Sequence, residues 1–143
     1  MKIYIAAPLF NDMEKQRNLE IDEFVRSIGF ETYLPQRDGG ELVKLTKDAE
    51  DKEKVRRMIF ERDFSEVKEC FLLLFLLDGR VPDEGACFEL GIAYALGKHC
   101  IGYQTDVRNF ANGHNNLMLD MALTSIARNL DELNIELQKF KKG

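Results

Sequence analysis

The chain of 143 residues has no tryptophan, only three prolines, three cysteines and two histidines. The cysteines are odd in number and lie in apolar stretches, which disfavours a disulfide framework and favours buried, reduced thiols in a cytoplasmic protein. Neither His99 nor His114 has the spacing of a metal ligand, and no Cys-x-x-Cys pair occurs. We therefore expect no metal site.

The sequence also lacks the segments and motifs that are typical of several other classes of protein. The longest apolar run, residues 70–77, is too short to cross a bilayer, and a strand pattern that starts at Lys2 leaves no room for a signal peptide. The net charge is −5 without a basic stripe, which argues against a nucleic-acid polymer as partner. No Gly-x-Gly-x-x-Gly, Walker A or Gly-x-Ser-x-Gly motif is present, so we expect no cofactor and a small-molecule ligand.

Apolar runs with the strand and helix periods alternate along the chain. Strands are predicted over residues 2–7, 30–34, 70–77, 100–103 and 124–127. Helices are predicted over residues 12–28, 49–69, 85–97, 117–123 and 130–140, with polar loops over 36–48 and 104–114. This alternation predicts one α/β domain over residues 1–143, a flavodoxin-like three-layer fold with a five-stranded parallel sheet in the order 2-1-3-4-5 and helices on both faces.

The helix over residues 85–97 is too apolar for a surface position, and Glu89 is its only carboxylate between Gly85 and Gly97. A lone carboxylate on a buried helix costs free energy unless it is paired with a cation or has a function, and this helix offers no cation. Glu89 also follows the central strand, so we expect it at the carboxyl end of the sheet, where open α/β sheets bind ligands.

More acidic side chains are expected at the same edge. Asp63 projects from the apolar face of the helix over 49–69, Asp83 precedes the Glu89 helix, and Asp78 lies in the same loop as Asp83. Tyr4 and Phe10 flank the end of the first strand. Paired carboxylates in different environments suit the chemistry of glycosidic bonds, with one as nucleophile and one as acid.

Each residue has a structural alternative. Asp83 would serve equally as a helix cap, and Asp78 before a glycine is typical of a turn. Asp63 has arginines nearby on its own helix as ion-pair partners. Tyr4 and Phe10 have the composition of ordinary core residues. Glu89 is the hardest of these to explain by structure alone.

Residues 2–10, 83–91, 95–98 and 116–118 together resemble the nucleoside 2-deoxyribosyltransferase family. The resemblance implies exchange of bases on 2′-deoxyribose, with Glu89 as the nucleophile at C1′ and Tyr4 orienting it. It further implies that Asp63 protonates the leaving base and that Asp83 holds the 5′-hydroxyl group.

The same resemblance implies further substrate-binding residues. Phe10 would line the base pocket beside Pro8, Gly85 belongs to the matched motif at the nucleophile helix, and the stretch from Gln36 to Asp38 would touch the base. In the family, an asparagine followed by Leu-Met reaches into the site of a neighbouring subunit. Here these residues are Asn116 and Met118, which implies a homo-oligomer, a dimer or a multiple of dimers, acting on a nucleoside and a free nucleobase.

Four rival functions stay open. A hydrolase of deoxynucleoside 5′-monophosphates belongs to the same superfamily, but such relatives carry serine where this chain has Asp83, whose charge would repel a phosphate. Hydrolysis of nucleosides differs from transfer only in the acceptor. A non-catalytic nucleoside sensor would gain from losing the Glu89 charge, and a flavin carrier needs a phosphate loop that residues 6–12 do not supply.

Overall fold

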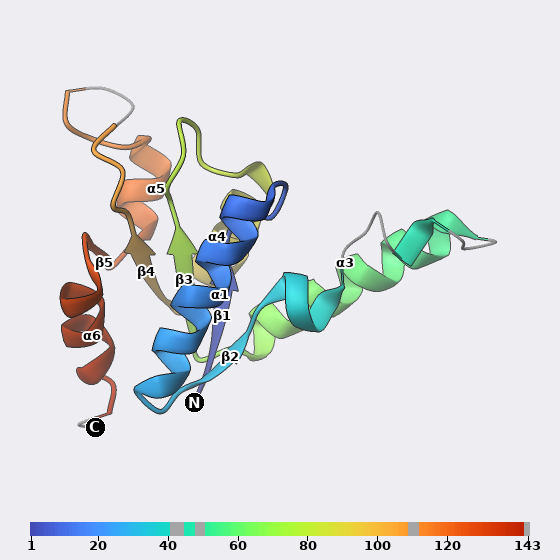
Figure 1. The fold of residues 1–143 in the computed structure, drawn as a ribbon, viewed down its shortest axis with the longest axis horizontal. Coiled ribbons are helices and arrows are strands. Elements are labelled where there is room, and N and C mark those ends of the chain that lie inside the picture. The colour runs from blue at the N-terminus through green and yellow to red at the C-terminus, as the bar shows by residue number, and fades with distance from the viewer. Residues whose placement is uncertain (41–44, 48–50, 109–111, 142–143) are drawn as a thin grey trace.

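Five parallel strands form the central sheet of the computed structural model, which describes residues 1–40, 45–47, 51–108 and 112–141. The strands lie in the order β2-β1-β3-β4-β5, which confirms the predicted fold class and strand order. Their bounds are β1 Lys2–Ala6, β2 Glu31–Tyr33, β3 Leu72–Leu76, β4 His99–Tyr103 and β5 Ser125–Ala127. Figure 1 shows the sheet at the centre of the molecule.

Helices connect the strands, and each of the α-helices named below begins after an asparagine or aspartate cap. The bounds are α1 Asp12–Ser27, α3 Lys52–Glu69, α4 Glu84–Ala95, α5 Leu117–Ala122 and α6 Leu130–Gln138. The caps, whose side chains accept a backbone N–H of the first turn, are Asn11, Asp51, Asp83, Asn116 and Asn129. Within the described ranges, no helix is both long and apolar enough to cross a membrane.

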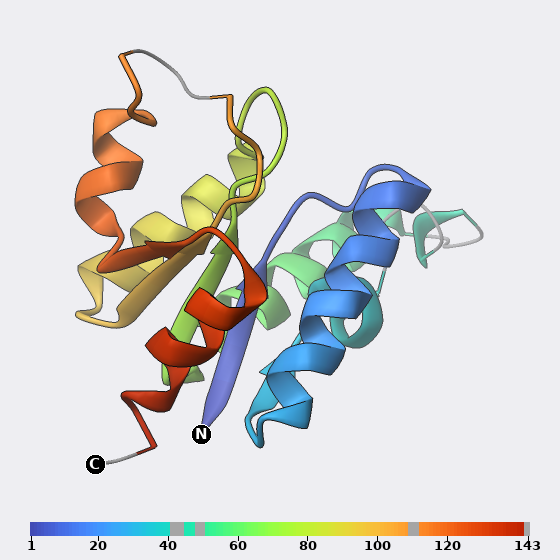
Figure 2. The ribbon, with the colours of Figure 1, turned by 60° about the vertical axis from the view of Figure 1, so that its left-hand side comes forward.

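Two apolar layers hold the helices on the sheet. Successive side chains of a strand point to opposite faces, so Ile3 and Ile5 of β1 pack with α1 and α6, whereas Tyr4 and Ala6 pack on the α3 and α4 side. Figures 1 and 2 show α1 and α6 on the same side of the sheet. The layer that holds Tyr4 is the one that positions the acidic groups.

The prediction of a loop over residues 36–48 is wrong for its first residues, because η1 Pro35–Gly39 forms a turn of π-helix. Pro35 stands in the first turn, where it needs no hydrogen-bond donor, and the side chain of Asp38 accepts the N–H of Leu34 at 2.9 Å. Residues 41–44 and 48–50 of that loop, and 109–111 of the second predicted loop, lie outside the described residues.

The prediction of a buried helix over residues 85–97 is also wrong. Only one face of α4 packs on the sheet, through Ala86, Leu90 and Ala93, while Phe88 on the opposite face is 57% exposed. The apolar composition of α4 favours burial of the whole helix. Within a single chain, however, only the side of α4 that packs on the sheet is covered.

The exposed apolar surface continues onto the neighbouring helices. Figure 1 shows the amino-terminal half of α3 extending away from the sheet. Phe60 and Phe64 on α3 stack at 5.9 Å, and Phe60 lies 6.3 Å from Phe88 on α4. We call the following exposed side chains on α3, α4 and α5 the apolar face: Met58, Phe60, Phe64, Phe88, Tyr94, Leu117, Met118 and Met121.

Candidate active site

Glu89 and Tyr4 form the centre of the acidic site. Tyr4 is fully buried on β1 and donates its hydroxyl hydrogen to Oε1 of Glu89 at 2.6 Å. Among the described residues, no lysine or arginine forms an ion pair with Glu89. The carboxyl group is thus held by a neutral donor in a place that water reaches poorly, as the sequence predicted for an acidic group without a cation.

Burial sets the charge of this pair. Removal from water raises the pKa of Glu89 to about 8. The Tyr4 hydrogen bond opposes the rise, while the charges of Asp63 and Asp83 add to it. Burial and the charge of Glu89 also raise the pKa of Tyr4, so its hydroxyl stays a donor. Asp63 and Asp83 therefore lie close enough to Glu89 to act on its protonation.

Asp63 has a tyrosine partner of its own. Tyr33 on β2 donates to Oδ1 of Asp63 at 2.8 Å. Burial raises the pKa of Asp63, and the Tyr33 hydrogen bond and the nearby Arg62 charge oppose that rise. Arg62 makes no hydrogen bond to Asp63 and donates instead to the carbonyl oxygen of Gly39 at 2.8 Å.

The register of the sheet places the two tyrosines side by side. Tyr4 of β1 is paired directly with Tyr33 of β2, and directly paired residues project to the same face of a sheet. Their rings stack at 5.4 Å with 22° between the planes. Two tyrosine–carboxylate pairs thus lie next to each other. Both tyrosines come from the sheet, whereas one carboxylate comes from α4 and the other from α3. Tyr33 was not among the predicted site residues, since a sequence does not reveal which residues are neighbours across parallel strands.

Asp83 closes the amino-terminal end of α4, and the loops beside it form a hollow. Its Oδ2 accepts the N–H of Ala86 at 2.8 Å, so the capping alternative holds for one of its oxygens. Asp83, Pro8 and Phe10 line a hollow of about 420 Å³, and Phe10 is 75% exposed there. Gly85 follows in the first turn of α4, where a β-carbon would approach Oδ2 of Asp83 to 3.1 Å.

Gln36 and Asp38 of η1 are engaged with other parts of the protein. Gln36 accepts from Asn18 at 2.8 Å and donates to the carbonyl oxygen of Lys15 at 3.0 Å. Asp38 binds Arg37 through both carboxylate oxygens, at 2.7 and 2.6 Å. These contacts fasten η1 to α1 and give both side chains a structural task.

Asn116 and Met118 lie on α5, which packs against α4. Asn116 accepts the N–H of Met118 at 2.9 Å and so caps its own helix. Met118 is 76% exposed. Within this chain neither residue hydrogen-bonds to Tyr4, Asp63 or Glu89 in the described ranges, so the structure does not bring them into the acidic cluster.

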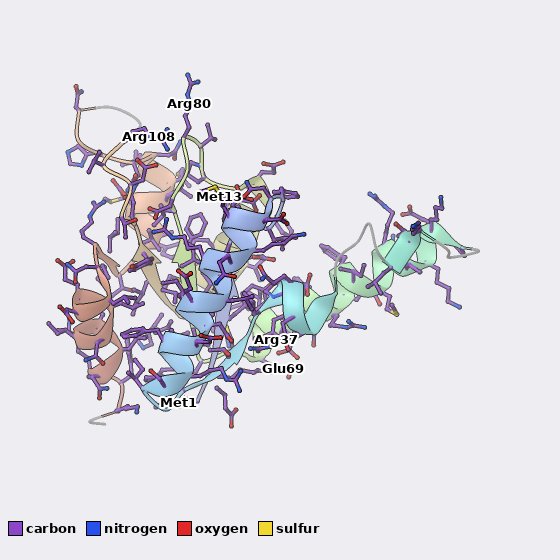
Figure 3. The ribbon with its side chains drawn as sticks, viewed as in Figure 1. Met1, Met13, Arg37, Glu69, Arg80 and Arg108 are labelled. Carbon is purple, nitrogen blue, oxygen red and sulfur yellow. The ribbon has the colours of Figure 1, made fainter. Side chains whose placement is uncertain are left out.

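A larger cleft, of about 650 Å³, opens on the other side of the loop after β1. Its charged groups satisfy one another: Asp78 pairs with Arg17 and accepts the N–H of Thr105 at 2.7 Å. Asp78 thus joins the loop after β3 to the loop after β4, which supports its structural alternative. Figure 3 shows Arg80 and Arg108 of these loops at the end of the molecule opposite Met1. No three acidic, histidine or cysteine side chains in the described residues are grouped to hold a metal.

The fold and this cluster define a class, a flavodoxin-like α/β protein with a carboxylate site at the edge of its sheet. The family model described as nucleoside 2-deoxyribosyltransferase matches residues 3–140. The chain therefore belongs to the nucleoside 2-deoxyribosyltransferase family, a family of enzymes, which confirms the resemblance seen in the sequence.

Solved structures share the fold. A conserved protein from Enterococcus faecalis V583 is 27% identical, with a TM-score of 0.82 over 97% of this chain and 98% of that one. The 2-deoxyribosyltransferase of Bacillus psychrosaccharolyticus is 22% identical, with a TM-score of 0.78 over 93% and 90%. The CMP N-glycosidase BcmB of Clostridium botulinum is 21% identical, with a TM-score of 0.59 over 96% and 99%. No protein of curated function matches the sequence.

The raised pKa of Glu89 makes stability depend on pH. The folded protein holds the Glu89 proton up to about pH 8, whereas the unfolded chain releases it near pH 4.5. Between these values the folded state binds more protons, so its stability falls as pH rises, by at most about 1.4 kcal/mol per pH unit. We expect Glu89→Gln to remove this slope and to be more stable than wild type above pH 8, as measured by urea unfolding across this pH range.

Glu23→Gln is the matched control, because Glu23 is an exposed glutamate on α1. Its unfolding curves should keep the wild-type dependence on pH. Parallel pH dependences for Glu89→Gln and the wild type would contradict the assignment of a dehydrated carboxyl group at position 89.

Proposed function

We propose that this protein transfers 2-deoxyribose between nucleobases through a covalent deoxyribosyl ester on Glu89. One observation carries the proposal: Glu89 is held by the Tyr4 hydroxyl at 2.6 Å, without a cation, near the partly buried carboxyl group of Asp63. A structural glutamate in such a place costs free energy, whereas a nucleophile benefits from a carboxylate that is poorly solvated and oriented. Membership of the family supports the same reaction.

The reaction has two halves. In the first half, the ionised form of Glu89, which is the minor form below about pH 8, bonds through one oxygen to C1′ while the bond from C1′ to the base breaks. The electron pair of the broken bond and the Asp63 proton pass to the base. In the second, a ring nitrogen of another base attacks C1′, returns a proton to Asp63 and releases the Glu89 carboxylate. Tyr4 keeps its proton throughout, because its hydrogen bond only orients Glu89.

Hydrolysis is the second candidate, since water would release the same ester and one structural neighbour is a CMP N-glycosidase. The position of Asp83 favours nucleosides over 5′-monophosphates. Its carboxylate caps α4 beside the hollow that Phe10 lines, where it would accept a 5′-hydroxyl hydrogen and repel a phosphate. We assign Pro8 and Phe10 to the walls of this hollow and Gly85 to the first turn of α4 beside Asp83. Gln36 and Asp38 are assigned to holding η1 in place through their hydrogen bonds to α1 and to the Leu34 N–H.

We further propose that the protein is a homo-oligomer in which Asn116 and Met118 complete the site of a partner subunit. The apolar face supports this, because exposed aromatic and methionine side chains on three neighbouring helices are typical of a surface that contacts another protein. Covering it would also exclude water and favour transfer over hydrolysis. The free thiols of Cys70, Cys87 and Cys100 agree with a cytoplasmic enzyme that reuses bases and deoxynucleosides.

Base exchange tests the proposed reaction. Incubation with deoxyinosine and free adenine should give deoxyadenosine by chromatography. Glu89→Ala should lower its rate at least about a thousandfold, because the nucleophile is lost, while Glu23→Ala keeps the wild-type rate. Deoxyribose and hypoxanthine as sole products would identify a hydrolase, and full activity of folded Glu89→Ala would reject the assignment.

Replacement of Asp83 tests recognition of the 5′-group. Asp83→Ser retains a good helix cap but removes the charge, so we expect 5′-monophosphates to become substrates and the KM for nucleosides to rise about tenfold, the effect of one lost charged hydrogen bond. Asp51→Ser makes the same change at the cap of α3 and should alter neither substrate. Continued exclusion of monophosphates by a folded Asp83→Ser enzyme would count against this role.

Mixed oligomers test the role of Asn116 across the interface. Subunits with Glu89→Ala and subunits with Asn116→Ala should each be inactive alone. In a two-fold dimer each site takes residues from both subunits, so co-expression should restore about a quarter of the wild-type activity. Light scattering gives the oligomeric state. A monomer that still exchanges bases, or mixed oligomers without activity, would contradict this role.

A further inference from the structure

Asp63 is enclosed on one side by groups that the proposed reaction does not use. Tyr33 donates to Oδ1 of Asp63 at 2.8 Å. A β-carbon at Gly39 would lie 2.8 Å from the same Oδ1 and 2.9 Å from the Tyr33 hydroxyl oxygen. The backbone of η1 thus passes so close to the Tyr33–Asp63 pair that only glycine leaves it undisturbed.

Gly39 is held in this place from the other side. Arg62, the neighbour of Asp63 on α3, donates to the carbonyl oxygen of Gly39 at 2.8 Å. The turn itself is fastened by the bond from the Leu34 N–H to Asp38 at 2.9 Å. Gly39 is buried and its φ lies outside the left-handed region, so space, not backbone conformation, is what requires glycine here.

We propose, resting on the reaction proposed above, that Tyr33 and Gly39 form a holder for Asp63 that occupies Oδ1 and leaves Oδ2 to carry the transferred proton. A carboxylic acid with one oxygen engaged as an acceptor presents its O–H from the other oxygen only. Tyr33 and Gly39 act through Asp63 and are positioning residues. The ring of Tyr33, stacked on Tyr4 at 5.4 Å, keeps the holder in line with Glu89.

The holder also tunes the acid. Tyr33 from β2 and Arg62 and Glu66 from its own helix act on the pKa of Asp63. The charge of Asp63 in turn raises the pKa of Tyr4 on β1 and of Glu89 on α4. Burial raises the pKa of Asp63, which favours the protonated acid, and the Tyr33 hydrogen bond restrains that rise. The acid can then release its proton to the base and take one back in the second half-reaction.

Two substitutions separate the parts of the holder. Tyr33→Phe removes only the hydroxyl, so the pKa of Asp63 rises, and the limb of the kcat/KM profile for deoxyinosine that reports Asp63 should move to higher pH. Gly39→Ala displaces the carboxyl group and should lower kcat about tenfold or more, because a small misplacement of a reacting group is costly. Carbon-13 NMR of the Asp63 carboxyl group measures its pKa in wild type and in Tyr33→Phe.

A second substrate distinguishes loss of acid catalysis from general damage. The cationic base of 7-methyl-2′-deoxyguanosine leaves without taking a proton, so both variants should lose much less activity on it than on deoxyinosine. Tyr103→Phe is the matched control, because Tyr103 is an equally buried strand tyrosine on the opposite face of the sheet. It should leave the pH profile and both rates unchanged.

The outcomes separate this inference from the proposed function. In an active wild-type enzyme, an unmoved pH profile and an unmoved Asp63 pKa in Tyr33→Phe overturn the holder. Equal losses on both substrates in Gly39→Ala overturn it as well. A wild-type protein that cleaves neither deoxyinosine nor 7-methyl-2′-deoxyguanosine instead overturns the proposed function.

Discussion

The hydrogen bond from Tyr4 to Glu89 is the interaction on which the acidic site depends. It connects the middle of the central sheet to α4 at 2.6 Å and satisfies one oxygen of a carboxyl group that burial would otherwise leave without a partner. A cation in the same place would lower the reactivity of the carboxylate, whereas a neutral donor orients it and leaves its charge available. Burial raises the pKa of Glu89, and the Tyr4 hydrogen bond opposes that rise without cancelling it.

The sheet repeats this arrangement once. Tyr33 stands beside Tyr4 in the parallel register and binds Asp63 as Tyr4 binds Glu89. Both tyrosines project to the face that α3 and α4 cover, so carboxyl groups from two different helices are held at neighbouring positions. Different surroundings give the two groups different tasks, which is how paired carboxylates divide the work at a glycosidic bond.

The same face of the sheet leads outward to the apolar face. One side of α4 packs on the sheet, and Phe88 and Tyr94 are exposed on the helix. On α3, Phe60 is exposed beside Phe88. A lone chain gains nothing from such side chains in water. A second subunit would bury them and would also cover the site, so one contact would serve both stability and exclusion of water.

Periodicity and composition were enough to predict the strand order, most element positions and the anomaly of Glu89 on an apolar helix, because these are local properties of the chain. They did not predict the π-helical turn at Pro35–Gly39, which depends on contacts with α1 and α3, nor the exposure of Phe88. Tyr33 and Gly39 became visible only in three dimensions. Their relation to Asp63 arises from strand register and from the close approach of three elements distant in sequence, and no local pattern encodes either.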